Sequence, residues 1–507
     1  MTRNRFKIGA LVGAVLLVVL AATAATAREM DKSQVPEYVG SQACLGCHTE
    51  KNIAWEESLH HTSFKLLDSP ADFPGDLSTV SPELMAELQK ADFLWRGKRF
   101  VAQDPVTGEY TYTKVEFDKA TSTYKPYKGG VFSASCGGCH SGAVNAGVHT
   151  TRIEPGISCE SCHGPGRDHI LGKGEVEAIV SSTVPSETCA QCHSGYNQLE
   201  GGTRHAAGYR PGQPIEEFEG FKAVEYDPEQ APPFLDDNNH LEQYPQWKAS
   251  GHAIATNTLI ERGPKYLARQ ECIYCHSTAA GIQIKGKGQV FDPATDLVND
   301  GVSCIACHDS HGGTGITAQL KMEPQALCVS CHSVGRGKPE PQTIGTVRPP
   351  HAPSADMLWG QAAIGIAPTK GAHSEITCIE CHMTEGNHMM KVVKPADAMG
   401  VEGRVDSCTK CHSDSSAESR GIYLELWKES IDSRLAAIAS DVELIDARLK
   451  DYPEALTGAD LELYKNARAN FWYVRKDNSG GAHNFEYAIK ILTQVQKDMI
   501  TVKIALK

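Results

Sequence analysis

The stretch Cys44-Leu45-Gly46-Cys47-His48 has the spacing C-x-x-C-H, and this spacing occurs nine times in the 507 residues. It is typical of c-type haem attachment. Two thiols about one helical turn apart reach the two vinyl edges of one porphyrin, and the histidine that follows lies beneath the ring, where it binds the iron. The predicted attachment cysteines are Cys44, Cys47, Cys136, Cys139, Cys159, Cys162, Cys189, Cys192, Cys272, Cys275, Cys304, Cys307, Cys328, Cys331, Cys378, Cys381, Cys408 and Cys411.

The cysteine count supports this interpretation, since the chain has 18 cysteines and the nine motifs use all of them. The alternatives are nine zinc knuckles or nine local disulfides. A zinc site usually takes two such cysteine pairs and does not require a histidine after every second cysteine. We therefore expect nine covalently attached haem c groups. Their proximal iron ligands would be the motif histidines His48, His140, His163, His193, His276, His308, His332, His382 and His412.

The N-terminus predicts export from the cytoplasm. Three basic residues precede an apolar run over residues 8–22, and Ala25-Thr26-Ala27 is a small-x-small cleavage signal, so residues 1–27 read as a signal peptide. The alternative is an uncleaved anchor helix, for which the run is short. Covalent haem attachment outside the cytoplasm agrees with export, and we expect a periplasmic or extracellular protein without a membrane span after cleavage.

The composition limits the kinds of partner. The net charge is −13, and it becomes −16 once residues 1–27 are removed. An acidic surface argues against nucleic acid and anionic membranes and permits an encounter with a basic redox partner protein. About 480 residues would carry nine haems, so we expect the porphyrins to supply much of the core.

Twelve histidines lie outside the motifs, which is enough for a second histidine on every haem. A sequence repeat, W-x-x-S-x-H, occurs at Trp55–His60 and Trp247–His252, in the two long gaps between haem motifs. Each copy presents a histidine at the end of a predicted helical segment, which favours His60 and His252 as distal ligands. His61 reads as an incidental surface residue.

Other distal candidates follow from their positions. His169 follows a Gly-Pro-Gly turn after His163, and His311 is three residues after His308, too close to bind the opposite face of the same haem, so it should bind a neighbouring one. The further distal candidates are His149, His351, His373 and His388, with His240 as a weaker one.

Residues 36–213 resemble the tetrahaem cytochrome c554 family. The likeness is carried by YVGSQACLGCH, W-x-x-S-x-H, a KRFV…TGEY segment with period-two alternation, CGGCH, SCESCHGPG, CAQCH and HAAGYRPG in that order. The alternation itself predicts a β-hairpin near residues 98–117. The resemblance implies periplasmic electron transfer through bis-histidine haems plus one haem without a protein distal ligand.

Residues 246–507 resemble the pentahaem nitrite reductases and octahaem hydroxylamine oxidoreductases in their CxxCHDxH and CxxCHM…H patterns. The resemblance implies a long C-terminal helix used for packing and subunit contacts, and a distal role for His483. Independently, apolar residues recur every three or four positions from Trp427 to Leu449, which predicts an amphipathic helix of about 30 residues. Pro453 should end it, with shorter helices near 460–476 and 484–504. This apolar stripe is also compatible with a homo-oligomer that forms through the C-terminal helices.

We therefore expect a mainly α, haem-packed multihaem cytochrome c with one β-hairpin and a C-terminal bundle of long helices. The predicted organisation is a signal peptide (1–27), a cytochrome c554-like domain (36–213), a linker rich in proline and acidic residues (214–245), a pentahaem domain (246–413) and a helical domain (414–507).

Two functions are compatible with these patterns. The first is an electron carrier that relays electrons between redox partners through closely packed haems. The second is an oxidoreductase that acts on a small nitrogen or sulfur compound, such as nitrite or hydroxylamine, at one five-coordinate haem. Against the second, the nitrite reductases carry a lysine in place of one proximal histidine, whereas all nine motifs here end in histidine. No motif distinguishes Tyr464, Tyr473 or Tyr487 as the crosslinked tyrosine of the hydroxylamine oxidoreductases, so we predict no catalytic residue. Haem storage, sensing or filament assembly is the remaining alternative.

Overall fold

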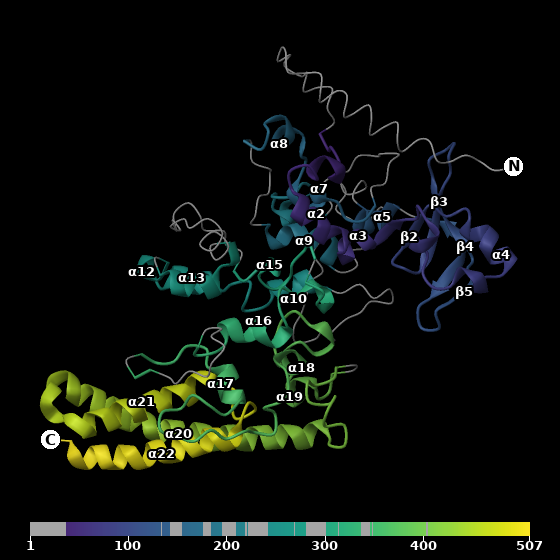
Figure 1. The fold of residues 1–507 in the computed structure, drawn as a ribbon. Coiled ribbons are helices and arrows are strands. Elements are labelled where there is room, and N and C mark those ends of the chain that lie inside the picture. Colours follow the sequence, from purple (N-terminus) through teal and green to yellow (C-terminus); the bar gives the residue numbers. More distant parts are fainter. Residues whose placement is uncertain are drawn as a thin grey trace.

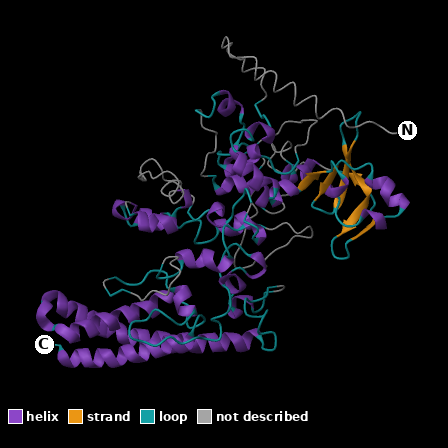
Figure 2. Cartoon of the chain, viewed as in Figure 1, coloured by secondary structure: helices purple, strands orange, loops and turns teal. Residues whose placement is uncertain are grey.

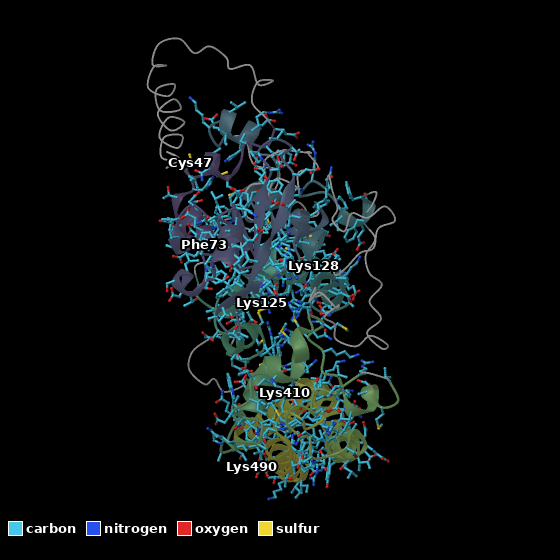
Figure 3. All side chains as sticks on the ribbon, turned by 90° about the vertical axis from the view of Figure 1, so that its right-hand side faces the viewer. Cys47, Phe73, Lys125, Lys128, Lys410 and Lys490 are labelled. Carbon is cyan, nitrogen blue, oxygen red and sulfur yellow. The ribbon has the colours of Figure 1, made fainter. Side chains whose placement is uncertain are left out.

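The computed structural model describes residues 37–132, 134–141, 155–175, 184–194, 209–218, 221, 242–267, 269–279, 301–312, 314–335, 345–346, 348–401 and 404–506. Within these residues the chain is mainly helical and contains one small antiparallel sheet (Figure 2). The sheet and the long C-terminal helices lie at opposite ends of the molecule, and short helices with the C-x-x-C-H motifs lie between them (Figure 1). A view from the side shows the same order, with Phe73 towards the sheet end and Lys490 in the C-terminal bundle (Figure 3).

The sheet forms around the predicted hairpin, which is confirmed as strands β3 (Arg99–Gln103) and β4 (Tyr110–Asp118). In the turn between them, the Asp104 carboxylate accepts hydrogen bonds from two backbone N–H groups, those of Val106 and Thr107. The sheet is larger than predicted, with the order β1-β2-β3-β4-β5 and with β6 paired to β4. The added strands are β1 (Phe64–Leu66), β2 (Phe93–Trp95), β5 (Thr123–Pro126) and β6 (Gly130–Val131).

The two faces of the sheet have different neighbours. One face packs Leu94, Phe100 and Val115 against helix α4 (Pro82–Leu88). The other face carries Phe93 and Trp95, because successive side chains of a strand point to opposite sides. The Trp95 ring lies edge-on to the His140 ring, with centroids 5.6 Å apart. The sheet therefore borders one of the predicted haem sites.

The middle of the molecule consists of short helices, most of them four to eight residues long. Helices of this length are not stable on their own in water, so their order must come from packing and from what their cysteines bind. Eight of the motifs lie on or beside η2 (Ser41–Cys44), α5 (Ala134–His140), α7 (Cys159–His163), α9 (Ser186–His193), α13 (Gln270–His276), α15 (Cys304–Cys307), α16 (Pro324–Cys331) and α18 (Cys378–His382). The helices between them are α2 (Thr49–Glu56), α3 (Leu59–Thr62), η3 (Pro70–Asp72), η4 (Leu77–Thr79), α8 (Arg167–Leu171), η5 (Ile215–Glu217), α10 (Gln243–Lys248), α11 (Asn257–Glu261), α12 (Pro264–Leu267), η6 (Thr317–Gln319), α17 (Ser354–Leu358), η7 (Thr384–Gly386) and α19 (Pro395–Ala398).

The three C-terminal helices are confirmed as α20 (Ala417–Asp451), α21 (Gly458–Asp477) and α22 (Phe485–Ala505), with η8 (Pro453–Ala455) after α20. Helix α22 packs against both others, and the apolar stripe of α20 faces inward at Ile431, Ile438, Val442 and Ile445. The inward stripe is part of the largest core cluster of the described residues, to which α21 and α22 also contribute. The stripe therefore serves as a packing face within the chain.

The three tyrosines considered in the sequence analysis are buried in this bundle. The Tyr464 hydroxyl donates to an Asp446 carboxylate oxygen at 2.7 Å, and the Tyr473 hydroxyl donates to the Gln361 carbonyl at 2.6 Å. The Tyr487 hydroxyl accepts from the backbone N–H of Ala363 at 3.2 Å. The first bond joins α21 to α20, and the bonds of Tyr473 and Tyr487 hold the segment after α17 on the bundle. In the described part of the chain, no helix is both long and apolar enough to cross a membrane.

Candidate haem-binding sites

Each site is named here by its motif histidine, so the His382 site comprises Cys378, Cys381 and His382. The motifs share one local geometry, a single helical turn. At the His48, His308, His332 and His412 sites, the histidine N–H donates to the carbonyl of the first cysteine at 2.8–3.0 Å. The turn brings two thiols to one side and the histidine to the next position, as attachment to one porphyrin requires.

The structure brings eight of the motif histidines close to a second histidine. The ring centroids are 5.9–6.4 Å apart in every pair. The pairs are His48–His169, His193–His60, His163–His311, His332–His252, His276–His351, His308–His388, His412–His373 and His382–His483.

This separation fits a haem iron between the two rings. An imidazole nitrogen binds a metal ion at about 2 Å and lies about 1 Å from its own ring centroid, so two rings on opposite sides of one iron have centroids about 6 Å apart. Rings in direct van der Waals contact would be closer, as Trp55 and His61 are at 4.2 Å. The donor set therefore suits a bis-histidine haem at eight sites, with the motif cysteines as attachment points.

Every predicted distal ligand that lies in the described residues belongs to one of these pairs. His311 faces His163 and not His308, as its short spacing from His308 requires. His169 faces His48, a motif far upstream, and not the nearby His163. Three other histidines, His149, His205 and His240, lie outside the described residues, and the predictions that His149 and His240 are distal ligands fall on them.

The W-x-x-S-x-H repeat has a structural counterpart. The indole N–H of Trp55 donates to the Ile157 carbonyl at 2.8 Å, and that of Trp247 donates to the Val302 carbonyl at 2.8 Å. The acceptors occupy equivalent positions in Gly156-Ile157-Ser158-Cys159 and Gly301-Val302-Ser303-Cys304. Each copy thus docks on the residues just before a haem motif, and its histidine faces the motif after that one.

The serine of the repeat has a role that the sequence analysis missed. The predicted helix does not run on to His60, because α2 ends at Glu56 and Ser58 starts a new helix, α3. The Ser58 hydroxyl accepts from the His61 N–H at 3.1 Å, as an N-cap serine does. In the second copy the Ser250 hydroxyl accepts from the His252 N–H at 3.2 Å. The preference of serine for helix N-caps was the available signal.

One short segment connects three sites. Residues 304–311 carry the His308 motif and also His311, which faces His163. The carbonyl of Ser310 lies 3.2 Å from Nδ1 of His60, which faces His193. The Gln319 side chain also joins the segment that carries His60 to the segment that carries Ser310. Its carbonyl accepts from the Leu59 N–H at 2.7 Å, and its amide donates to the Asp309 carbonyl at 2.9 Å. The N-terminal and C-terminal haem motifs are joined through this segment.

Hydrogen bonds connect successive sites in the N-terminal part. The Cys159 N–H donates to the Ser41 hydroxyl beside the His48 motif, and the Gln191 amide donates to the Ser161 carbonyl of the His163 motif. The Ser63 hydroxyl bonds the carbonyls of both His60 and His140. These contacts make the His48, His163, His193 and His140 sites direct neighbours.

The C-terminal sites are joined in the same way. Burial raises the pKa of Cys307 in the His308 motif to about 11, with a smaller contribution from the Cys331 thiol of the His332 motif. The Cys378 N–H donates to the Gln325 side chain on α16 at 2.9 Å, and the Thr384 hydroxyl donates to Ser407 just before the last motif at 3.0 Å. The Thr256 hydroxyl, shortly after His252, donates to the His276 carbonyl.

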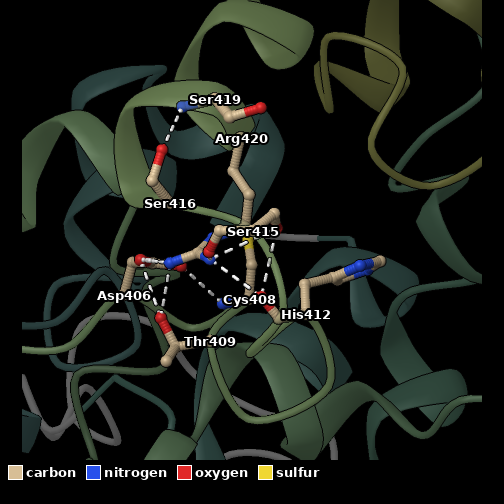
Figure 4. Close-up of polar contacts among 8 residues, drawn as sticks. All are labelled: Asp406, Cys408, Thr409, His412, Ser415, Ser416, Ser419 and Arg420. Carbon is tan, nitrogen blue, oxygen red and sulfur yellow. Dashed lines mark hydrogen bonds and ion pairs between the residues drawn. The ribbon is translucent and has the colours of Figure 1, made fainter.

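The last motif is held by an arginine rather than by a helix of its own. The Arg420 guanidinium on α20 donates to the Asp406 carboxylate at 2.6 Å, to the Thr409 hydroxyl at 2.7 Å and to the His412 carbonyl at 2.9 Å (Figure 4). Asp406 is 2% exposed. Burial acts to raise the pKa of Asp406, but the bonds from Arg420, Thr409 and the Cys408 N–H hold it below its usual value. The C-terminal bundle is thereby tied to the His412 site.

Burial keeps several of the paired imidazoles neutral. It lowers the pKa of His193 to about 4, with a smaller contribution from His60, and it lowers the pKa of His252 to about 4, with a smaller contribution from His332. Metal ions bind the neutral form of imidazole. At neutral pH these side chains are therefore in the form that an iron ion requires.

Comparisons with known proteins agree with this arrangement. A family model described as cytochrome c554 and c-prime matches residues 107–164 and 237–309, and a model described as a doubled CXXCH motif matches residues 296–337. The first model thus matches the second copy of the repeat, Trp247–His252, and extends into the half of the chain that resembles the nitrite reductases in its motifs. A comparison with curated protein sequences gave no match.

Among solved structures, the outer cell wall cytochrome OcwA superposes with a TM-score of 0.71 at 25% identity, over 92% of this chain and 100% of that one. The chain has the fold of a multihaem cytochrome c. The undecahaem cytochrome from the S-layer of Carboxydothermus ferrireducens shares this cytochrome fold, with a TM-score of 0.57 at 20% identity over 92% of this chain and 69% of its own. The cytochrome c nitrite reductase of Desulfovibrio desulfuricans matches half of the chain with a TM-score of 0.38, which carries no argument about activity.

Proposed function

We propose that this multihaem cytochrome carries nine haems and transfers electrons along them. The observation that supports the proposal most strongly is the set of eight histidine pairs at about 6 Å in one connected array. Two protein ligands leave no open position on an iron, which suits electron transfer and excludes direct binding of a substrate. When bound, the haems supply reversible one-electron chemistry.

The contacts between sites define a route through the chain. It runs from the His48 site through the His163 and His193 sites to the His308 site, and continues through the His332 and His382 sites to the His412 site. The His140 site joins it at His193 and the His276 site joins it at His332. The protein holds these sites adjacent and fixes the orientation of each imidazole, which are its usual contributions to cofactor chemistry.

We further propose that the protein is exported and exchanges electrons with redox partner proteins in the periplasm or at the cell surface. The basic and apolar residues before Arg28 support export, and OcwA, the relative with 25% identity, is named as an outer cell wall protein. The acidic charge favours a basic partner surface. A homo-oligomer through the C-terminal helices also stays a proposal, and it would have to use their outer faces, because the apolar stripe of α20 is buried within the chain.

The proposal is tested on the purified holoprotein by intact-mass analysis and low-temperature EPR of the oxidised form. We expect the mass of nine haems and low-spin signals from the paired sites. A mass that corresponds to fewer haems would contradict the number. A high-spin signal that nitrite or hydroxylamine perturbs would contradict a pure electron carrier and would direct attention to turnover assays.

A further inference from the structure

The turn between α21 and α22, residues 477–484, contacts two neighbouring histidine pairs. His483 within the turn faces His382, with ring centroids 6.3 Å apart. The carbonyl of Ala482, the preceding residue, lies 2.9 Å from Nδ1 of His373, which faces His412. One turn therefore orients the distal histidine of both the His382 and the His412 sites.

The two histidines are oriented by groups of different charge. Nδ1 of His483 lies 2.6 Å from Oδ1 of Asp477, and the side chains are 20% and 5% exposed. The second carboxylate oxygen of Asp477 accepts from the hydroxyl and, at 3.4 Å, from the N–H of Ser479. Within the described residues, Nδ1 of His373 faces the neutral carbonyl of Ala482 and no carboxylate. The carboxylate of Asp477 is thus buried, fixed from two sides and directed at one imidazole.

We propose that Asp477 is a positioning residue that lowers the reduction potential of the haem at the His382 site through His483. The inference rests on the proposed function, because it takes His483 as an iron ligand through Nε2, which leaves the proton on Nδ1. A carboxylate that accepts this proton's hydrogen bond fixes the ring and makes the imidazole a stronger donor. A stronger donor stabilises ferric over ferrous iron, and hydrogen bonding around the ligands is one of the ways in which a protein sets a haem potential.

A second carboxylate contact in the chain is much weaker. Asp309 Oδ1 lies 3.5 Å from Nδ1 of His311, with side chains 28% and 34% exposed. A longer contact in a more solvated position has a smaller electrostatic effect. It provides an internal comparison, because Asp309→Asn should alter the His163 site less than Asp477→Asn alters the His382 site.

The test is a potentiometric titration of the holoprotein followed by low-temperature EPR, with Asp477→Asn as the first variant. We expect all low-spin haems to be retained and the redox equilibrium constant of one of them to change about tenfold towards the ferrous form. For a one-electron couple this is a rise of about 59 mV. The g-values of the same haem should change, because its axial ligand has become a weaker donor, and Asp477→Glu should restore much of both properties.

Asp356→Asn is the matched control for charge alone. Asp356 is also buried, at 2% exposure, and its carboxylate accepts from the Val334 N–H at 2.7 Å and from the Gln361 side chain at 3.3 Å, so its described partners include no histidine ring. This variant removes the same charge close to the His332 site. We expect no change in the g-values of any haem, which separates an effect through the ligand from a general loss of negative charge.

The variant His483→Ala tests whether His483 is an iron ligand, independently of whether Asp477 tunes the haem. If His483→Ala leaves every haem low-spin, His483 is not a ligand and that part of the proposed function fails. If it produces one high-spin haem while Asp477→Asn leaves all potentials and g-values unchanged, the role of Asp477 is overturned and the ligation stands. Should Asp477→Asn fail to mature, Ser479→Ala decides the question. It removes a donor to the carboxylate, together with that hydroxyl's contacts to the Gly481 and His483 N–H groups, and should raise the same potential by a smaller amount.

Discussion

The two copies of the W-x-x-S-x-H segment are nearly identical in their backbone contacts and differ in what surrounds their histidines. In both, a tryptophan N–H reaches the carbonyl before a haem motif at 2.8 Å, and the histidine carbonyl accepts from the N–H of that same residue, at 2.9 Å for Ile157 and 2.8 Å for Val302. Nδ1 of His60, however, faces the Ser310 carbonyl, whereas Nδ1 of His252 lies 2.7 Å from the Met390 sulfur.

This comparison separates two functions of the protein around a haem. The repeated contacts determine where a histidine lies, and they are conserved between the copies because both dock on the same backbone geometry. The Nδ1 partner influences how strongly that histidine donates to iron, and it comes from different parts of the chain in the two copies. Position and electronic tuning are therefore encoded by separate residues, and the two can be altered independently.

The largest expected effect comes from the glycines on which the copies dock. Gly156 and Gly301 have φ of +65° and +55°, and an added Cβ would lie 2.3 Å from the His61 carbonyl oxygen and 2.2 Å from the His252 carbonyl oxygen. Gly156→Ala and Gly301→Ala should each displace the docked segment and cost about 3–5 kcal/mol. The measurements are holoprotein yield, thermal midpoint and EPR spin state.

The neighbouring Gly251→Ala is the control for these variants, because a Cβ there meets nothing within 4 Å. Gly156→Ala should disturb the His193 site and Gly301→Ala the His332 site. If the two variants damaged the same site, or if Gly251→Ala were equally harmful, the equivalence of the two copies would be wrong.

A smaller and equal effect is expected for the two tryptophans. Trp55→Phe and Trp247→Phe keep most of the ring and remove the indole N–H, which leaves a partly buried carbonyl without its donor. Each should lower stability by about 1–2 kcal/mol, seen as a lower thermal midpoint. Trp472→Phe is the comparison, because the Trp472 indole nitrogen has no hydrogen-bond partner within the described residues. A much larger loss for one copy than for the other would show that their docking differs in strength.

The smallest effect should be an electronic one, confined to the second copy. Met390→Leu removes the sulfur next to His252 but leaves the Met390 carbonyl, which lies 3.2 Å from Nδ1 of His382. A thioether is a weak acceptor, so we expect the redox equilibrium of the His332 haem to change by less than about threefold and that of the His193 haem not at all. Redox titration followed by EPR measures both, with Met389→Leu as the control. A shift at the His193 haem would show that the tuning of the two copies is coupled.

Local patterns in the sequence predicted much of this fold. The nine motifs, the β3–β4 hairpin and the three C-terminal helices could be predicted because each depends on residues close together in the chain. The short strands β1, β2, β5 and β6 could not, because two to four residues are too few for a periodic pattern. The sequence indicated which histidines are candidate distal ligands, but it did not indicate which motif histidine each one faces. His169 faces His48, which lies upstream of it, and His373 faces His412, which lies downstream. Domain boundaries, including the linker over 214–245, stay a prediction.

The segment from Cys304 to His311 also has a consequence for how the protein is made. In the proposed exported cytochrome, the N-terminal part of the chain leaves the cytoplasm first, so Cys159 and Cys162 would reach the compartment of haem attachment before His311 does. A haem attached at the His163 site would then lack its second histidine, His311, until residues 304–311 arrive. Haem attachment and completion of the histidine pair would therefore be separate events in time at this site.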